Sequence, residues 1–143
     1  MRLTQFTDYA LRLLIYAATH PDRLITIEET AEAYGISRNH LMKVANHLAR
    51  EGYLRSVRGR SGGLSLAMRP AEIGLGRVVR TTEPDFAIVE CFGADDRCRI
   101  TPSCRLRGIL DGALAAFLAE MDRHSLADLI VDPAQFGIER PAA

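Results

Sequence analysis

The chain has few cysteines, and it lacks the long apolar runs that identify membrane proteins. Its 143 residues include three cysteines, and an odd number of thiols argues against a closed disulfide framework. No segment reaches the ~20 continuous apolar residues of a membrane span, so we expect no membrane partner. The apolar run near the N-terminus is interrupted by Asp8 and Arg12 and precedes no cleavage pattern, which argues against a secretory signal. We therefore expect a protein of the reducing cytoplasm.

Net charge is also absent, because 18 basic and 18 acidic residues cancel. The two halves of the chain are nevertheless different. Residues 1–80 carry twelve basic and seven acidic side chains, whereas residues 81–143 carry six and eleven. This asymmetry suggests a polyanion-binding half joined to a half with another role.

The basic half has the pattern of a helix-turn-helix. Apolar residues surround the segment 6–18 almost completely, which predicts a helix buried on more than one side. Thr26 and Glu29 have the spacing of a capping box, which predicts the start of a second helix. Ser37 can cap a third helix that runs to about Arg50. Two short helices joined by so short a turn form a helix-turn-helix.

The third predicted helix has one apolar face and one polar face. Its polar face lacks acidic residues from 37 to 50, whereas an ordinary solvated face mixes both signs of charge. Asn and Arg can make paired hydrogen bonds to adenine and guanine edges in the major groove. We therefore predict a recognition helix rather than a merely solvated one. The predicted DNA-contacting residues of this helix are Ser37, Arg38, Asn39, His40, Lys43, Asn46 and Arg50.

A β-hairpin is expected directly after the recognition helix. Residues 53–57 and 64–67 alternate as short strands do, and a glycine-rich turn joins them. The glycines alone would indicate only a turn. After a recognition helix, however, the hairpin becomes a wing whose Arg58 and Arg60 can reach phosphate or the minor groove. The predicted fold is mainly α with a small β-hairpin, a winged helix-turn-helix.

The acidic half is dominated by one long amphipathic helix. Residues 70–80 predict a shorter helix, residues 82–103 are mostly loop, and the long helix spans about 105–123. Its broad apolar stripe could pack within one chain or against a second copy. A twofold-symmetric dimer can place two recognition helices on the two half-sites of a symmetric operator. We therefore predict a homodimer joined by this dimerisation helix. The tail from residue 133 is expected to be loosely held.

All three cysteines, Cys91, Cys98 and Cys104, fall within one fourteen-residue stretch. Three thiolates on one loop can bind a soft metal centre and leave one coordination position for another ligand. Structural zinc sites usually show a short Cys-x₂₋₄-Cys knuckle and four ligands, and neither is evident here. The spacing favours an iron–sulfur cluster but leaves zinc open. An enzyme with an open-site cluster is less consistent, since the loop offers Arg97 and Arg99 but no evident base.

Four segments resemble one known family: Leu-Thr-Gln-Phe-Thr-Asp-Tyr-Ala-Leu-Arg at 3–12, Gly-Ile-Ser-Arg-Asn-His-Leu-Met-Lys at 35–43, Arg-Gly-Arg-Ser-Gly-Gly-Leu-Ser-Leu-Ala at 58–67 and Cys-Arg-Ile-Thr-Pro-Ser-Cys-Arg-Leu at 98–106. They are similar to the iron–sulfur winged-helix repressors, and most similar to the nitric-oxide-sensing members. The resemblance extends to about residue 132. It implies a homodimer with a [4Fe–4S] cluster, or alternatively [2Fe–2S], held by three cysteines of one subunit and an aspartate of the other. The matching residues are Cys91, Cys98, Cys104 and, from the partner subunit, Asp8.

The resemblance also implies a function. From the sequence alone, Asp8 would be an acidic residue favoured near a helix N-terminus. Related regulators of cluster biogenesis use a histidine three residues after the last cysteine, where this chain has Arg107. The implied protein is not an enzyme but a DNA-binding repressor that senses nitric oxide and releases a twofold-symmetric operator on nitrosylation; an iron- or redox-responsive regulator is the alternative. Its parts would be a DNA-binding domain (1–82), a cluster-binding loop (83–104) and a dimerisation helix with C-terminal tail (105–143).

Overall fold

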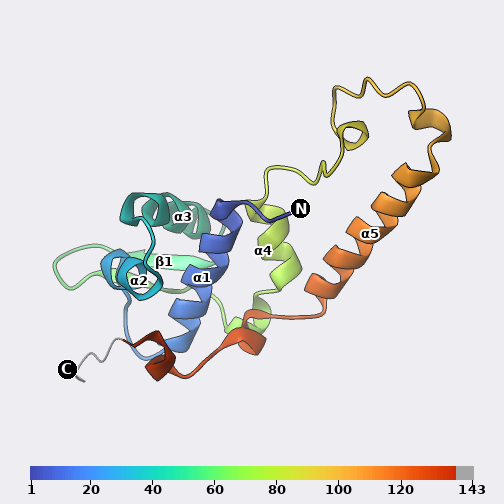
Figure 1. The fold of residues 1–143 in the computed structure, drawn as a ribbon. Coiled ribbons are helices and arrows are strands. Elements are labelled where there is room, and N and C mark those ends of the chain that lie inside the picture. The colour runs from blue at the N-terminus through green and yellow to red at the C-terminus, as the bar shows by residue number, and fades with distance from the viewer. Residues whose placement is uncertain (138–143) are drawn as a thin grey trace.

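The computed structural model describes residues 1–137, which form a helical body and a projecting arm (Figure 1). The helices and strands are α1 (Gln5–Thr19), α2 (Ile27–Tyr34), α3 (Arg38–Arg50), β1 (Leu54–Val57), β2 (Gly63–Leu66), α4 (Leu75–Thr82) and α5 (Arg105–Asp122). The arm consists of α5 and the loop that precedes it. This architecture confirms the predicted fold class of a mainly helical chain with a small hairpin.

The core of the body lies between α1 and α3, which pack against each other. Leu13 and Leu14 of α1 are fully buried, as are Leu41 and Leu48 of α3. Leu41 and Leu48 are seven residues apart, about two helical turns, and so lie on one face of α3 with the buried Val44 and Ala45 between them. Burial of each such side chain contributes about 1.5–3 kcal/mol. One face of α3 is therefore committed to the core, and the opposite face is left for another purpose.

Local capping fixes the helix-turn-helix as the sequence predicts. The Thr26 hydroxyl accepts a hydrogen bond from the Glu29 N–H, and the Glu29 carboxylate accepts one from the Thr26 N–H. Gly35 then ends α2 with φ of 62°, a left-handed conformation that suits glycine. The Ser37 hydroxyl accepts a hydrogen bond from the His40 N–H and starts α3.

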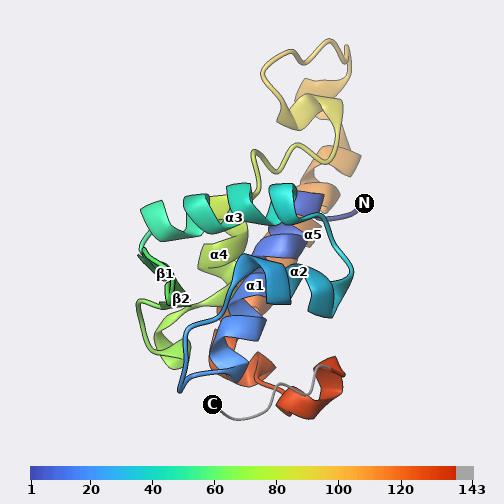
Figure 2. The same cartoon turned by 90° about the vertical axis from the view of Figure 1, so that its left-hand side faces the viewer.

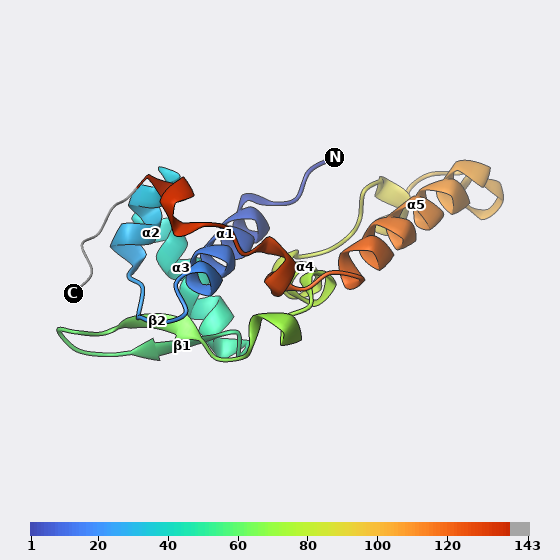
Figure 3. The same ribbon diagram turned by 90° about the horizontal axis from the view of Figure 1, so that it is seen from below.

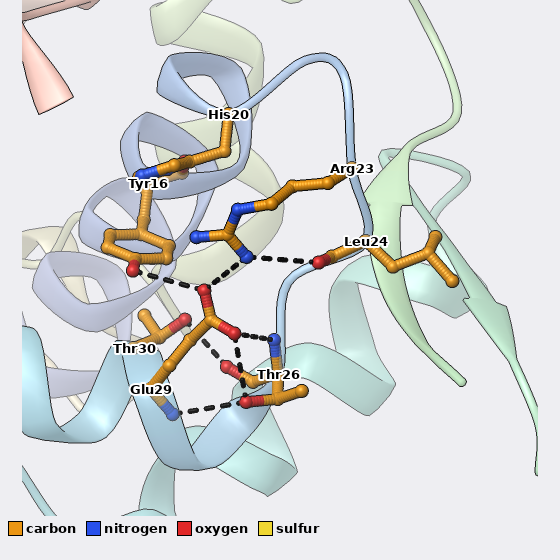
Figure 4. Close-up of polar contacts among 7 residues, drawn as sticks. All are labelled: Tyr16, His20, Arg23, Leu24, Thr26, Glu29 and Thr30. Atoms are coloured by element: carbon orange, nitrogen blue, oxygen red, sulfur yellow. Dashed lines mark hydrogen bonds and ion pairs between the residues drawn. The ribbon is translucent and has the colours of Figure 1, made fainter. Parts of the chain in front are cut away.

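A buried carboxylate ties α1 to α2 (Figure 4). Glu29 is 1% exposed, and its Oε1 lies 2.6 Å from Arg23 Nη1 and accepts a hydrogen bond from the Tyr16 hydroxyl at 3.1 Å. Burial acts to raise the pKa of Glu29. The hydrogen bonds from Arg23 and from the Thr26 backbone more than offset burial, and the pKa lies below its usual value. The carboxylate therefore stays charged and holds the two helices together.

The hairpin forms the predicted wing. Leu54 pairs with Leu66 and Val57 with Gly63 in an antiparallel register. An additional bridge joins Ile25 to Leu64 and fastens the hairpin to the segment before α2. Figure 3 shows the far end of the hairpin extending beyond the body.

The predicted helix over 70–80 is wrong in detail. It is divided into a 3₁₀ turn, Pro70–Glu72, and α4, Leu75–Thr82. The intervening backbone pairs with the chain that follows α5: the Leu126 N–H donates to the Ile73 carbonyl and the Leu75 N–H to the His124 carbonyl. Long-range pairing therefore interrupts what local spacing presents as one helix.

The arm touches the body through α4. No residue of α5 is buried along its fully described length, and Leu106 and Ile109 are 58% and 67% exposed. Near its C-terminal end, Asp122 forms a bidentate ion pair with Arg80 of α4. A Cβ on Gly76 would collide with the Asp122 carboxylate, so a larger residue there would have to displace that side chain.

The segment after α5 returns to the body, so the expectation of a loose tail from residue 133 is wrong for residues 133–136; residues 138–143 of that tail lie outside the described residues. Pro133–Phe136 forms a 3₁₀ turn. The Phe136 ring lies 5.0 Å from the ring of Tyr16 and 5.4 Å from that of Tyr34. This aromatic contact joins the end of the described chain to α1 and α2. Among residues 1–137, no helix is long and apolar enough to span a membrane.

Candidate nucleic-acid interface and cysteine loop

The outer face of α3 is exposed and basic. Figure 2 shows α3 along one edge of the helical body, with α1, α2 and α4 on one side of it. Asn39, Lys43, Asn46 and Arg50 are all exposed, and α3 contains no acidic residue. These side chains share one face because they recur at three- and four-residue steps. The structure thus presents the predicted stripe to solvent as one polar surface.

Arg38 is partly neutralised, unlike the rest of the predicted contacts. Its Nη2 lies 2.6 Å from Glu28 Oε1 of α2, and its Nε also donates to that oxygen. The same Arg38 contact helps to hold the pKa of Glu28 below its usual value, after the larger effect of the Glu28 backbone N–H. Arg38 therefore brings less net positive charge to the surface than its sequence position suggests.

The two histidines of α3 lean toward α1. The His40 ring lies 4.9 Å from the ring of Tyr9 and is half-buried. The His47 ring packs edge-on against Phe6 at 5.4 Å, and its Nε2 lies 3.1 Å from the Thr81 carbonyl oxygen. Each histidine therefore has a structural role, and a DNA contact by His40 stays a prediction.

The wing carries unpaired cations at its tip. Arg58 and Arg60 are exposed, and within residues 1–137 neither has an ion-pair partner. Gly62 closes the tip by donating to the Gly59 carbonyl, and a Cβ on Gly62 would collide with the Val57 carbonyl. A further exposed cation, Arg55 on β1, lies between α3 and the tip in the sequence and was not among the predicted contacts.

Met42, on the outer face of α3, was also not among the predicted contacts. It is 41% exposed although it is apolar. The available signal was spacing, because Met42 follows Asn39 by three residues and precedes Asn46 by four. Both intervals place neighbours on one helix face.

Figure 1 shows the loop before α5 projecting from the body as part of the arm, and this loop contains all three cysteines. All are free thiols; Cys98 is exposed, while Cys91 and Cys104 are partly buried. Within the described chain, no three Cys, His, Asp or Glu side chains are close enough to hold a single metal ion.

Cys104 occupies a position that favours negative charge. It is the N-cap of α5, and no side-chain hydrogen bond caps that helix. The free N–H groups and the helix dipole make this end partially positive, which suits a bound anion. Four cations border the last two cysteines, namely Arg97, Arg99, Arg105 and Arg107. The donor set and its surroundings thus fit an anionic thiolate-bound centre.

Asp8 lies in the first turn of α1, where it forms a bidentate ion pair with Arg12. The two contacts measure 2.9 and 3.0 Å, and both side chains are more than one-third exposed. The Arg12 guanidinium also lies near the rings of Tyr9 and Tyr34. Asp8 is therefore accessible from outside the chain, with Arg12 as its intramolecular partner.

Comparison with known proteins identifies the family. The Rrf2 family, described as iron-dependent transcriptional regulators, matches residues 3–132. The chain belongs to the Rrf2 family. Among its relatives, the HTH-type transcriptional regulator NsrR of Bacillus subtilis is 51% identical over 132 residues, covering 91% of this chain and 90% of the relative. NsrR of Geobacillus kaustophilus is 47% identical and covers 94% and 92%.

Two solved structures have the same fold. The IscR structure from T. potens superposes with a TM-score of 0.74 at 20% identity, covering 99% of this chain and 94% of that one. The oxidized CymR of Staphylococcus aureus gives 0.70 at 24% identity, with 88% and 93% covered. Family membership establishes a DNA-binding transcriptional regulator and not an enzyme. The family description also agrees with an iron centre on this Rrf2 chain.

Proposed function

We propose that this Rrf2 protein is a repressor that senses nitric oxide through a [4Fe–4S] cluster and releases its operator when the cluster is nitrosylated. The observation that carries the proposal is the combination of a basic helix-turn-helix with three free cysteines on one projecting arm. The identity to NsrR of Bacillus subtilis supports nitric oxide as the signal. The description of the family as iron-dependent favours an iron- or redox-responsive regulator as the second candidate.

The cluster ligands are Cys91, Cys98 and Cys104 of one subunit and Asp8 of the partner subunit. The positive N-terminal end of α5 and the neighbouring arginines suit this anionic centre. When bound, the cluster supplies iron that can bind nitric oxide, and a carboxylate is a harder and more exchangeable ligand for it than thiolate. The chain would hold the three thiolates in place and would let the Asp8 carboxylate leave the iron when another ligand binds.

Asp8 also gives the sensor a route to the DNA-reading surface. It belongs to α1, and α1 packs against the recognition helix α3. Once released, the carboxylate has Arg12 as an alternative partner on the same helix. A change in the partner of Asp8 could therefore shift α1, and a shift of α1 would be transmitted to α3 because α1 supplies many of the core residues that pack beneath α3.

A second copy of the chain is needed both for Asp8 and for the arm. The arm exposes Leu106 and Ile109 on α5, and such an apolar surface is stabilised when a partner covers it. A twofold dimer would place two recognition helices for two half-sites of a symmetric operator. The functional parts remain a DNA-binding domain at 1–82, a cluster-binding loop at 83–104 and a dimerisation helix with tail at 105–143.

The ligand assignment is tested by visible absorption of protein purified without oxygen. Cys91→Ala, Cys98→Ala and Cys104→Ala are each expected to lose most of the iron–sulfur absorption. Asp8→Ala should retain a bound but more labile cluster, while Asp22→Ala, which removes an exposed acid elsewhere, should behave as wild type. Full-strength absorption in all three cysteine variants would show the assignment to be wrong.

A further inference from the structure

Met42 is an apolar residue on an otherwise polar surface. Its side chain is 41% exposed, and it is not among the described residues that pack against the core. Asn39 and Asn46 lie on either side of it along the same face of α3. Around this row, α3 presents Lys43 and Arg50 and no acidic residue. The surface is therefore one apolar group between two amides, in a positively charged setting.

A single exposed methionine is common on protein surfaces and indicates nothing by itself. Its position on α3 is what gives it meaning, because the N-terminal part of a recognition helix contacts base edges. Met42 is the fifth residue of α3. The major groove offers an apolar group, the 5-methyl of thymine, and it offers adenine as a paired hydrogen-bonding partner for asparagine. The row of Asn39, Met42 and Asn46 matches these two kinds of group.

We propose that Met42 packs against a thymine 5-methyl group in the major groove and makes the protein prefer an A·T pair at that position. Asn39 and Asn46 provide hydrogen bonds to adenines beside it. The flexible, unbranched methionine side chain can follow the methyl group without a change in the helix. This inference rests on the proposed operator-binding function and adds a specificity-determining residue to it.

The test removes the methyl group from DNA while leaving every hydrogen bond of the base pair in place. An operator is first selected from a random duplex library with the full-length, cluster-loaded protein. Each thymine of one half-site is then replaced in turn by deoxyuridine, and dissociation constants are measured for wild type, Met42→Ala and Met42→Leu. The control is Val57→Ala. Val57 is an exposed apolar residue of the wing, with 43% of its surface exposed, so this variant removes a similar amount of apolar surface outside α3.

Wild type is expected to lose about fourfold in affinity at one thymine of the half-site, the effect of burying one methyl-sized group. Met42→Ala should bind the unmodified operator more weakly and should no longer respond to deoxyuridine at that one position. Met42→Leu should keep part of the response, and Val57→Ala should keep all of it. The loss of response at a single base identifies a contact, whereas a general structural defect would weaken binding to all duplexes alike.

Two results would overturn the inference. Wild type could be indifferent to deoxyuridine at every thymine, or Met42→Ala could remain as sensitive as wild type. Failure of the proposed operator recognition, on which this inference rests, has a different signature, because the library would then yield no enriched sequence and the cluster-loaded protein would bind all duplexes equally.

Discussion

The wing arginines and Arg38 are expected to contribute differently to the salt dependence of DNA binding. Arg58 and Arg60 are exposed cations without ion-pair partners in the described chain, whereas Arg38 is paired with Glu28 at 2.6 Å. Each phosphate contact steepens the plot of log affinity against log salt by about 0.9. Arg58→Ala should thus flatten the slope by about 0.9 for each half-site, or about 1.8 for a twofold operator.

Arg38→Ala is the matched control, because it also removes one arginine from the reading surface. Its effect on the slope should be less than half that of Arg58→Ala, since Glu28 already compensates its charge. Conversely, Glu28→Gln should free Arg38 and make the slope steeper. Fluorescence anisotropy with operator and random duplexes, measured between about 50 and 200 mM salt, gives all the slopes.

A contact between a wing arginine and a DNA phosphate does not depend on the base sequence. Arg58→Ala should therefore weaken operator and random duplexes by the same factor. An equal flattening by Arg38→Ala and Arg58→Ala would refute the reasoning from the Glu28 ion pair. No change of slope in any variant would refute phosphate contact by the wing.

Three further predictions concern how the arm and the helices are held. Glu29→Gln should lower the free energy of unfolding by about 1–3 kcal/mol near neutral pH. Because the pKa of Glu29 is lowered in the folded state, its charged carboxylate stabilises the fold at pH values above its unfolded pKa of about 4.3. In denaturant titrations, wild type should lose this contribution as the pH falls through the folded pKa, whereas Glu29→Gln should not. Gly76→Ala should displace Asp122 and raise hydrogen exchange in α5, whereas Arg69→Ala, which breaks an ion pair outside that junction, should not. Phe136→Ala should lower stability by about 1–3 kcal/mol, since the ring is only partly buried; an unchanged melting temperature would contradict the observed packing.

Local signals were enough to predict the helix-turn-helix and the wing. The Thr26–Glu29 capping box, the Gly35 ending and the Ser37 cap all act within a few residues, so sequence spacing reveals them. The polar stripe of α3 was predicted in the same way. The structure places Asn39 and the rest of that stripe on one exposed face.

Features that depend on distant segments were missed or misjudged. The pairing of residues 73–75 with 124–126 divides a helix that local spacing presents as continuous. Phe136 finds its aromatic partners on α1 and α2, about a hundred residues earlier in the sequence. The ion pair between Glu28 and Arg38 spans two helices and changes the charge that Arg38 offers to DNA. Such contacts follow from the tertiary arrangement and leave no periodic signal.

The most direct test of the proposed sensor is an anaerobic titration of the cluster-loaded dimer on its operator with nitric oxide. Cluster absorbance and operator occupancy are recorded in the same sample. We predict that both fall in parallel, with a coupling free energy of ~1–3 kcal/mol, and that Asp8→Ala weakens this coupling more than it weakens operator binding by the loaded protein. Loss of cluster absorbance with unchanged operator affinity would contradict nitric-oxide sensing and would favour an iron- or redox-responsive regulator.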